Sequence, residues 1–249
     1  MPDALGYRMK FGVIAPSTNT IVQPEFGWME PHGVTNHFSR IHIPDDPLGS
    51  DADFEELMVR IRAELMQAVD RVMTASPGAI VMGMSSETFW GGLAGSIDLK
   101  AKLEARAGGL SVAMGSDASQ AALKCYGDIK RIAVVTPYMP VGDGEVRKFF
   151  TDCGYEVMAV EGLKSKSPTG IAHVDGKTLR DAVNAVNDSK VEAILQVGTN
   201  LAFAKIAPMA EFWLDKPVLA INTATYWHAL RMNGLTDKVR GLGSLLEDY

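Results

Sequence analysis

The sequence has little cysteine and no histidine pattern typical of a metal site. Cys125 and Cys153 are its two cysteines in 249 residues, which excludes a disulfide scaffold and favours a reducing cytoplasm. The five histidines form no HxH or HExxH pair, and none stands beside a cysteine. Composition therefore predicts a cytoplasmic protein without a metal site.

Long apolar runs, positive charge and phosphate-binding loops are scarce as well. The longest apolar runs are far shorter than the ~20 residues of a membrane span, and we expect no signal peptide. The formal net charge of -6, without a basic stripe interleaved with aromatics, argues against a nucleic-acid partner. No expected strand is followed by GxGxxG, which argues against a nucleotide-dependent oxidoreductase.

Short β-rich apolar runs alternate with amphipathic stretches along the whole chain. This alternation is typical of βαβ units and predicts an α/β fold with parallel sheets. We expect strands at 9–17, 37–44, 78–83, 110–116, 131–137, 155–162, 193–198, 216–222 and 239–246. Helices are expected at 51–75, 117–126, 143–153, 177–188, 202–213 and 224–233.

The second half of the chain repeats the first. "FGVIAPSTNT" resembles "RIAVVTPYMP", "VMGMS" overlays "QVGTN", and "LSVAMGSDASQAALKCYG" overlays "PVLAINTATYWHALRMNG". All βα units share some likeness, which is the alternative explanation, but three matches in one order favour a duplication. The expected domains are 1–115 plus 222–249 and 116–221, with the last strand crossing back to the first sheet.

Such a duplication predicts a ligand cleft between the halves. Ligands of open parallel sheets sit beyond the carboxyl ends of the strands. Four strand-end loops, at 16–20, 83–88, 137–142 and 198–201, are expected around the cleft. Two more, at 115–119 and 222–226, are expected to close its sides.

Several of these segments resemble a known group of enzymes. "GVIAPSTNT", "VVTPYMP" and "GLGSLLEDY" resemble the maleate cis-trans isomerases, and "VMGMSSETFWGG" resembles the arylmalonate decarboxylases. Both belong to the aspartate/glutamate racemase superfamily, and the resemblance covers nearly the whole chain. It implies two pseudo-symmetric, Rossmann-like α/β domains that hold a small carboxylate between them without metal, pyridoxal phosphate or nucleotide. It is compatible with a homo-oligomer.

The resemblance identifies the positions at which this chain lacks the cysteines of the superfamily. Members of this superfamily use one or two thiols at strand ends, where a lowered pKa makes each a base or nucleophile. Carried onto this chain, the two thiol positions fall on Gly83 and Gly198. Cys125 and Cys153 are expected late in helices, as packing residues. The usual thiol chemistry is therefore not expected.

Polar residues at the strand ends are candidates for holding a carboxylate. Asn19 matches the family's carboxylate-binding asparagine, with Ser17 beside it as a hydroxyl donor; the alternative role for both is a helix N-cap. Tyr138 matches a tyrosine that hydrogen-bonds the substrate carboxylate, and is otherwise a surface loop aromatic.

The central loops supply the rest of the expected cradle. Ser85 and Ser86 from one half would face Thr199 and Asn200 from the other, with backbone N–H groups near Gly83 and Gly198. Turns use the same residue types, which leaves a purely structural role open for this set. Thr169 and its neighbours are expected to touch the ligand.

Glu87 is the one acid in the central loops. Burial would raise its pKa and suit it to general acid or base work, whereas a solvated loop glutamate is the alternative. We therefore expect a cofactor-independent decarboxylase, lyase or isomerase acting on a small mono- or dicarboxylate, with Glu87 and Tyr138 as catalytic residues. The alternatives are maleate isomerase-like activity and a non-catalytic carboxylate-binding protein.

Overall fold

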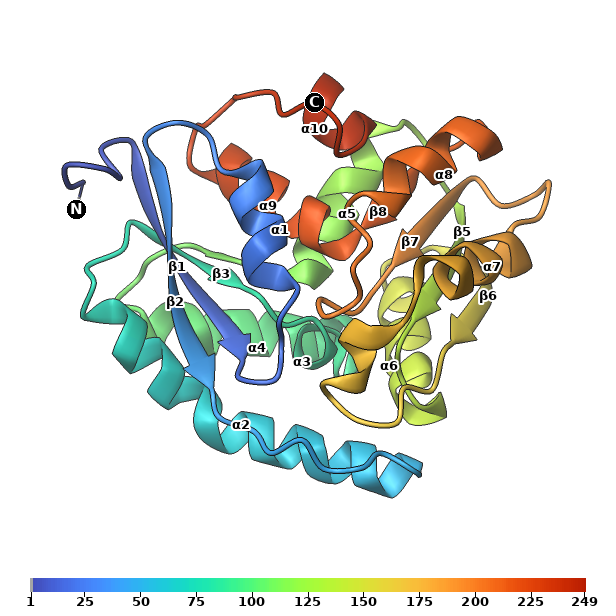
Figure 1. Cartoon of the computed structure of the whole chain (residues 1–249), viewed down its shortest axis with the longest axis horizontal. Helices are drawn as coiled ribbons and strands as arrows, with labels where there is room; N and C mark the ends of the chain where they lie inside the picture. Colours follow the sequence, from blue (N-terminus) through green and yellow to red (C-terminus); the bar gives the residue numbers. More distant parts are fainter. Residues whose placement is uncertain (1) are drawn as a thin grey trace.

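Two parallel four-stranded sheets form the framework of the computed structural model, which describes residues 2–249. The sheets have the orders β2-β1-β3-β4 and β6-β5-β7-β8, so each strand of the first corresponds to the strand four later in the second (Figure 1). This confirms the predicted pair of similar α/β halves with parallel sheets. The strands are β1 (Met9–Pro16), β2 (Val34–Ile41), β3 (Ala79–Met82), β4 (Val112–Ala113), β5 (Arg131–Thr136), β6 (Glu156–Gly162), β7 (Ala193–Gln196) and β8 (Val218–Ala220).

Helices cover both sheets. They are α1 (Val22–Met29), α2 (Asp51–Met73), α3 (Ser86–Phe89), α4 (Gly92–Arg106), α5 (Gly115–Cys125), α6 (Pro140–Asp152), α7 (Gly176–Val186), α8 (Ile206–Leu214), α9 (Ile221–Met232) and α10 (Ser244–Asp248), with a 3₁₀ turn at Gly170–His173. The six predicted helices are present, whereas α1, α3, α4 and α10 were not predicted. None of the helices within residues 2–249 combines the length and apolar character that a membrane crossing requires.

The predicted final strand at 239–246 is wrong. Gly241 and Gly243 take positive φ angles of 82° and 103°, which a strand does not sustain, and α10 begins at Ser244. The turn is closed by Val239 N donating to Leu246 O at 3.0 Å. The C-terminal segment therefore does not complete the first sheet.

The segments 115–119 and 222–226 were also predicted wrongly as loops. Strands β4 and β8 are short, and helices α5 and α9 begin at Gly115 and Ile221. The apolar residues continue from strand into helix, so the sequence hides the boundary. Gly115 lets the two helices meet, because an added Cβ would lie 3.0 Å from Ile221 Cδ1.

The last long helix returns to the first half of the molecule. Helix α9 follows a strand of the second sheet but packs against β3, β4 and α1 of the first half. These contacts support a first domain of 1–115 plus 222–249 and a second of 116–221, a division that stays a prediction.

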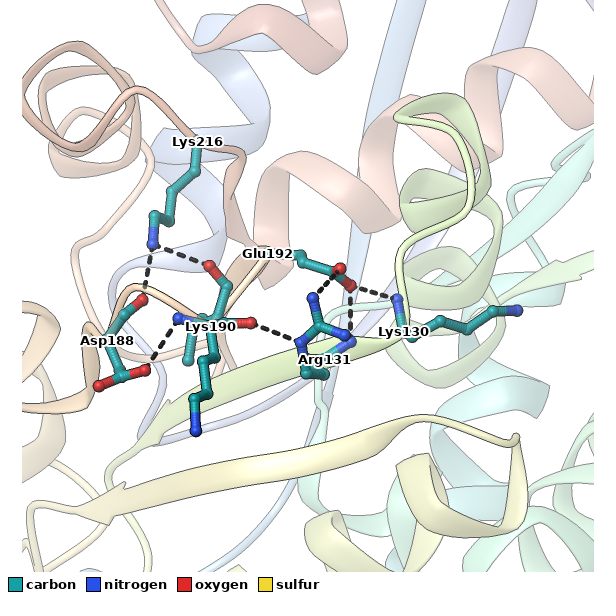
Figure 2. Close-up of polar contacts among 7 residues, drawn as sticks. Lys130, Arg131, Asp188, Lys190, Glu192 and Lys216 are labelled. Carbon is teal, nitrogen blue, oxygen red and sulfur yellow. Dashed lines mark hydrogen bonds and ion pairs between the residues drawn. The ribbon is translucent and has the colours of Figure 1, made fainter.

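A polar cluster holds the starting edge of the second sheet (Figure 2). The Glu192 carboxylate accepts hydrogen bonds from the backbone N–H groups of Lys130 at 2.7 Å and Arg131 at 2.8 Å. These donors hold the pKa of Glu192 below its usual range. Lys216 donates to two backbone oxygens of the 188–191 segment. The charged side chains of Glu192 and Lys216 thus have hydrogen-bond partners at the amino ends of the strands. Ligands of such sheets bind at the opposite edge, beyond the carboxyl ends.

An aromatic cluster joins the two halves where α3 contacts α6. Phe89 of α3 packs edge-on against Phe149 of α6 at a centroid distance of 4.9 Å, and Phe150 lies 5.3 Å from Phe149. All three rings are fully buried. The interface between the halves is therefore continuous with the core, which makes independent unfolding of one half unfavourable.

We expect Phe149→Ala to destabilise the protein by about 3–5 kcal/mol, because it removes a fully buried ring and leaves a cavity. Urea unfolding followed by circular dichroism measures this loss. The matched control is Phe212→Ala, whose ring is 87% exposed and which should leave the midpoint nearly unchanged. Equal effects of the two substitutions would contradict the assignment of the cluster to the core.

Candidate active site

A cavity of about 60 Å³ lies between the two halves, where β1, β3, β5 and β7 end. At roughly 10–15 Å³ per water, it has room for a small molecule. All four strand-end loops predicted to surround the cleft contribute to it, whereas 115–119 and 222–226 do not. Its lining comprises Pro16, Thr18, Asn19, Ile43, Leu48, Phe54, Leu57, Ile61, Met84, Ser85, Ser86, Pro137, Tyr138, Pro168, Ile171, Gly198, Thr199 and Asn200.

One wall of the cavity is a connected set of hydroxyl and amide groups. The Tyr138 hydroxyl lies 2.9 Å from Ser85 Oγ, which also accepts the backbone N–H of Thr199 at 3.2 Å. Asn19 Nδ2 donates to Thr199 Oγ1 at 3.0 Å. Ser86 borders the same wall. Because these donors come from both halves, a bound anion would be held between them.

Asn19 takes the capping role that the sequence left open, and it also lines the cavity, where its contact with a carboxylate stays a prediction. Its Oδ1 accepts the N–H groups of Ile21 at 3.0 Å and Val22 at 2.9 Å, and so satisfies the first turn of α1. Its amide nitrogen faces Thr199 at the cavity. Capping fixes the side chain, so the amide is already oriented before a ligand enters.

Asn200 ties the two halves together beside this wall. Its Oδ1 accepts the backbone N–H of Thr20 at 3.0 Å, and its Nδ2 donates to Pro168 O at 2.9 Å. The side-chain oxygen and nitrogen therefore both have protein partners. Asn200 lines the cavity, but its main role in this structure is to hold the strand-end loops in register.

Much of the remaining lining forms an apolar wall. Helix α2 contributes Phe54, Leu57 and Ile61, and Phe54 packs on Tyr138 at a centroid distance of 5.4 Å. Met84 and Ile171 extend the same surface. Among the residues that the structure describes, no charged side chain lines the cavity. The site is thus divided into a neutral donor wall and an apolar wall.

Two segments close the cavity from opposite halves. The backbone N–H of Leu48 donates to Lys166 O at 2.6 Å. Thr169, expected to touch the ligand, instead donates through its N–H to Asp45 Oδ1 at 2.8 Å and through its hydroxyl to the same carboxylate. Thr169 therefore joins the two closing segments and does not line the cavity.

Burial sets the protonation of the phenol. Removal from water raises the pKa of Tyr138, so its hydroxyl is protonated at neutral pH. Thr136 Oγ1 accepts the backbone N–H of Tyr138 at 3.0 Å and donates to Asp143. Burial raises the pKa of Asp143 to about 6, although the Thr136 hydrogen bond opposes this. Tyr138 thus presents a neutral hydroxyl that shares a hydrogen bond with the Ser85 hydroxyl.

Glu87 does not face this cavity. Its Oε1 accepts a hydrogen bond from Arg62 Nε at 2.6 Å, in a separate hollow of about 420 Å³ that Trp90 also lines. Burial does raise the pKa of Glu87. However, Ser86 opens helix α3, and consecutive helical residues point in different directions. The expected catalytic role of Glu87 is therefore not supported by its placement.

Ser17 and Gly83 lie next to the cavity without lining it. Ser17 Oγ donates to Ile43 O at 3.2 Å and accepts Ile43 N at 3.1 Å, which joins two segments of the first half. The Gly83 carbonyl accepts the Thr199 hydroxyl at 3.2 Å. An added Cβ at Gly83 would lie 3.1 Å from Ala15 Cβ, so that position is tightly packed.

Gly198 lines the cavity in a conformation that excludes other residues. Its φ is +124°, and an added Cβ would lie 2.4 Å from Pro137 Cδ. The two cysteines are remote: Cys125 ends α5 and Cys153 caps α6. Burial raises the pKa of both thiols, that of Cys153 to about 11, so neither is disposed to form a thiolate.

Sequence reasoning missed the apolar wall of the cavity. Phe54, Leu57 and Ile61 lie on one face of a helix, a spacing that indicates only burial. Thr18, expected as a hydroxyl donor beside Asn19, does line the cavity, whereas Met84 lies within a predicted loop but was not expected to touch the ligand. The first three could not be distinguished from core residues, because their role depends on how the halves pack.

Comparison with known proteins agrees with this architecture. No curated protein sequence matches the chain. Among solved structures, a Nocardia farcinica maleate cis-trans isomerase mutant with a covalently bound succinylcysteine intermediate superposes with a TM-score of 0.87 at 22% identity, covering 97% of this chain and 99% of its own. A Pseudomonas putida maleate isomerase variant with maleate gives 0.83 at 22%, covering 96% and 97%. A liganded double mutant of arylmalonate decarboxylase gives 0.82 at 19%, covering 97% and 100%.

At these identities the structural likeness shows a shared fold. The family assignment comes from the sequence model of the arylmalonate decarboxylases, which matches residues 12–246. This match includes both sheets and every strand-end loop around the cavity. The chain therefore belongs to the arylmalonate decarboxylase family.

Proposed function

We propose that this protein is a cofactor-independent decarboxylase of a small carboxylate that carries a second carboxylate and an apolar substituent on the same carbon. The observation that carries the proposal is the division of the cavity into a neutral donor wall and an apolar wall. Tyr138, Ser85 and the Thr199 N–H suit one carboxylate, and the surface around Phe54 suits the substituent.

The reaction follows from the different surroundings of the two carboxylates. A carboxylate against the apolar wall lacks hydrogen-bond partners, which disfavours its charge. Breaking its bond to the central carbon releases neutral CO₂, and the bonding electrons pass to that carbon and the remaining carboxylate. The resulting enediolate gains charge beside the polar wall that contains Tyr138, Ser85 and Thr199.

Tyr138 is the proposed proton carrier. Its buried hydroxyl stays protonated at neutral pH and can donate to the central carbon of the enediolate, after which water restores the proton. The product is the monocarboxylate. Glu87 takes no part in this scheme, because its carboxylate is paired with Arg62 outside the cavity.

The proposal assigns no step to a thiol. Gly83 and Gly198 occupy the positions that the family resemblance gives to cysteines, and Gly198 has no space for a Cβ. Cysteine adducts, as in the maleate isomerase structure with succinylcysteine, are therefore not expected here.

Incubation with phenylmalonate, methylmalonate and maleate tests the function directly. We expect CO₂ release from phenylmalonate, slower release from methylmalonate because it fills less of the apolar wall, and no fumarate from maleate. Fumarate formation with phenylmalonate left intact would overturn the proposal. Binding of phenylmalonate without CO₂ release would instead indicate a non-catalytic carboxylate-binding protein.

We expect Tyr138→Phe to lower kcat for phenylmalonate about a hundredfold to a thousandfold, because it removes a hydroxyl from the polar wall beside which the charge would develop. Steady-state CO₂ release measures the loss. Tyr126→Phe is the matched control, since its hydroxyl bonds Ser244 away from the cavity. A Tyr138→Phe enzyme that retains full kcat would rule out this role for the phenol.

The double variant Cys125→Ser/Cys153→Ser should keep kcat and KM within about twofold of the parent, because neither thiol reaches the cavity. The same decarboxylation assay measures it, and iodoacetamide treatment of the parent should likewise leave activity unchanged. Loss of activity with an unchanged unfolding midpoint would show that a thiol takes part after all.

A further inference from the structure

A ring of hydrogen bonds lies directly behind the donor wall of the cavity. Asn19 at the start of α1 holds the Thr199 hydroxyl, and Asn222 of α9 donates through Nδ2 to Thr199 O at 2.9 Å. The same Nδ2 donates to Glu25 Oε2 at 2.6 Å, and Glu25 lies on α1. The ring therefore returns to the helix from which it starts, and Thr199 is its member at the cavity.

Glu25 is the charged member of this ring. It is 2% exposed and reaches from α1 into the second half, where Oε1 accepts the backbone N–H of Ala204 at 3.0 Å. Both carboxylate oxygens thus face N–H donors. A protonated carboxyl would direct an O–H group at a donor, so the observed contacts fit the ionised form.

We propose that ionised Glu25 is a positioning residue for the donor wall: it holds Asn222 on the Thr199 carbonyl, and protonation of Glu25 releases that contact. Thr199 is the residue through which Glu25 acts, and Glu25 itself does not line the cavity. The inference rests on the proposed function in one respect, namely that the Thr199 wall binds a carboxylate.

The structure contains the acceptor that a protonated Glu25 needs. Asn222 Oδ1 is buried and has no hydrogen-bond partner among the described residues. Rotation of the Asn222 amide by half a turn would present Oδ1 to the Glu25 O–H group. The same rotation would carry Nδ2 away from Thr199 O and leave that carbonyl without this donor.

The surroundings of Glu25 bring this change near neutral pH. Burial raises the pKa of Glu25 to about 7, while the Asn222 and Ala204 donors and the Lys205 ammonium oppose the rise. On the α9 side, Tyr226 packs on Phe26 and bonds Asn36, so Asn222 is the α9 group that contacts the carboxylate. The positioning contact is therefore present above about pH 7 and lost below it.

Phenylacetate, a monocarboxylate with an apolar substituent, is the binding probe for this proposal. We expect its affinity, measured by calorimetry, to rise roughly tenfold from pH 6 to pH 8. A tenfold change is the effect on affinity expected from one hydrogen bond. A purely electrostatic role of Glu25 predicts the opposite, because the ionised carboxylate would repel the ligand. Affinity that falls or stays constant as pH rises therefore overturns the proposal.

The Glu25→Gln variant should bind phenylacetate about tenfold more weakly at pH 8 and lose the pH dependence, since glutamine cannot ionise. Glu30→Gln is the matched control: it lies at the C-terminal end of the same helix, is exposed and bonds Asn36. It should keep the pH profile of the parent. An unaltered profile in Glu25→Gln would overturn the proposal.

A ligand-free measurement separates this inference from the proposed function. Nuclear magnetic resonance of the unmodified chain can follow the Glu25 carboxyl carbon and the Asn222 side-chain amide through a pH titration. We expect both to shift with one midpoint near pH 7. An Asn222 amide that stays fixed while Glu25 titrates overturns the positioning role. Coupled shifts with no phenylacetate binding at any pH support the positioning role and count against the proposed function.

Discussion

The contact of Thr199 with the first half is the interaction on which the cavity depends. Its hydroxyl lies between Asn19 and the Gly83 carbonyl, and its N–H reaches Ser85. These bonds are buried, so each unmade one would leave a polar group without water or protein. The two sheets can therefore approach only in the arrangement that satisfies them all, and that arrangement places donors from both halves around one small space.

The likeness of the two halves explains why a few strand-end residues are enough to form the cavity. Each half ends its central strands with the same kind of loop, and the two sheets share one strand order. When two such edges face each other, their strand-end donors converge without any long insertion. Helix α2 then supplies what the duplication does not, the apolar residues Phe54, Leu57 and Ile61 of the cavity lining. The polar groups and the apolar surface of the cavity thus come from different elements, the strand-end loops and helix α2.

The sequence was sufficient for local features and insufficient for those that depend on packing between the halves. Strand ends at Pro16, Met82 and Thr136, and the polar residues that follow, could be predicted because apolar runs and turn residues are local signals. The glycines at 241 and 243 were overlooked as strand breakers. Glu87 was expected in the cavity and lies outside it for a different reason. Its orientation depends on the short helix α3, which has too few residues to give a recognisable sequence pattern.

The charged residue Glu25 lies behind the donor wall and not in the cavity lining. A cationic residue in the cavity wall would hold every carboxylate of a substrate with similar strength and would not favour the loss of one. In the proposed reaction, the neutral wall of Ser85, Tyr138 and Thr199 stabilises a carboxylate in one fixed direction, and a carboxylate outside its reach gains nothing. Fixed direction requires a rigid support, and the bonds of Glu25 to Ala204 and Asn222 supply it one layer behind the wall. The buried charge thereby orients the site without entering it.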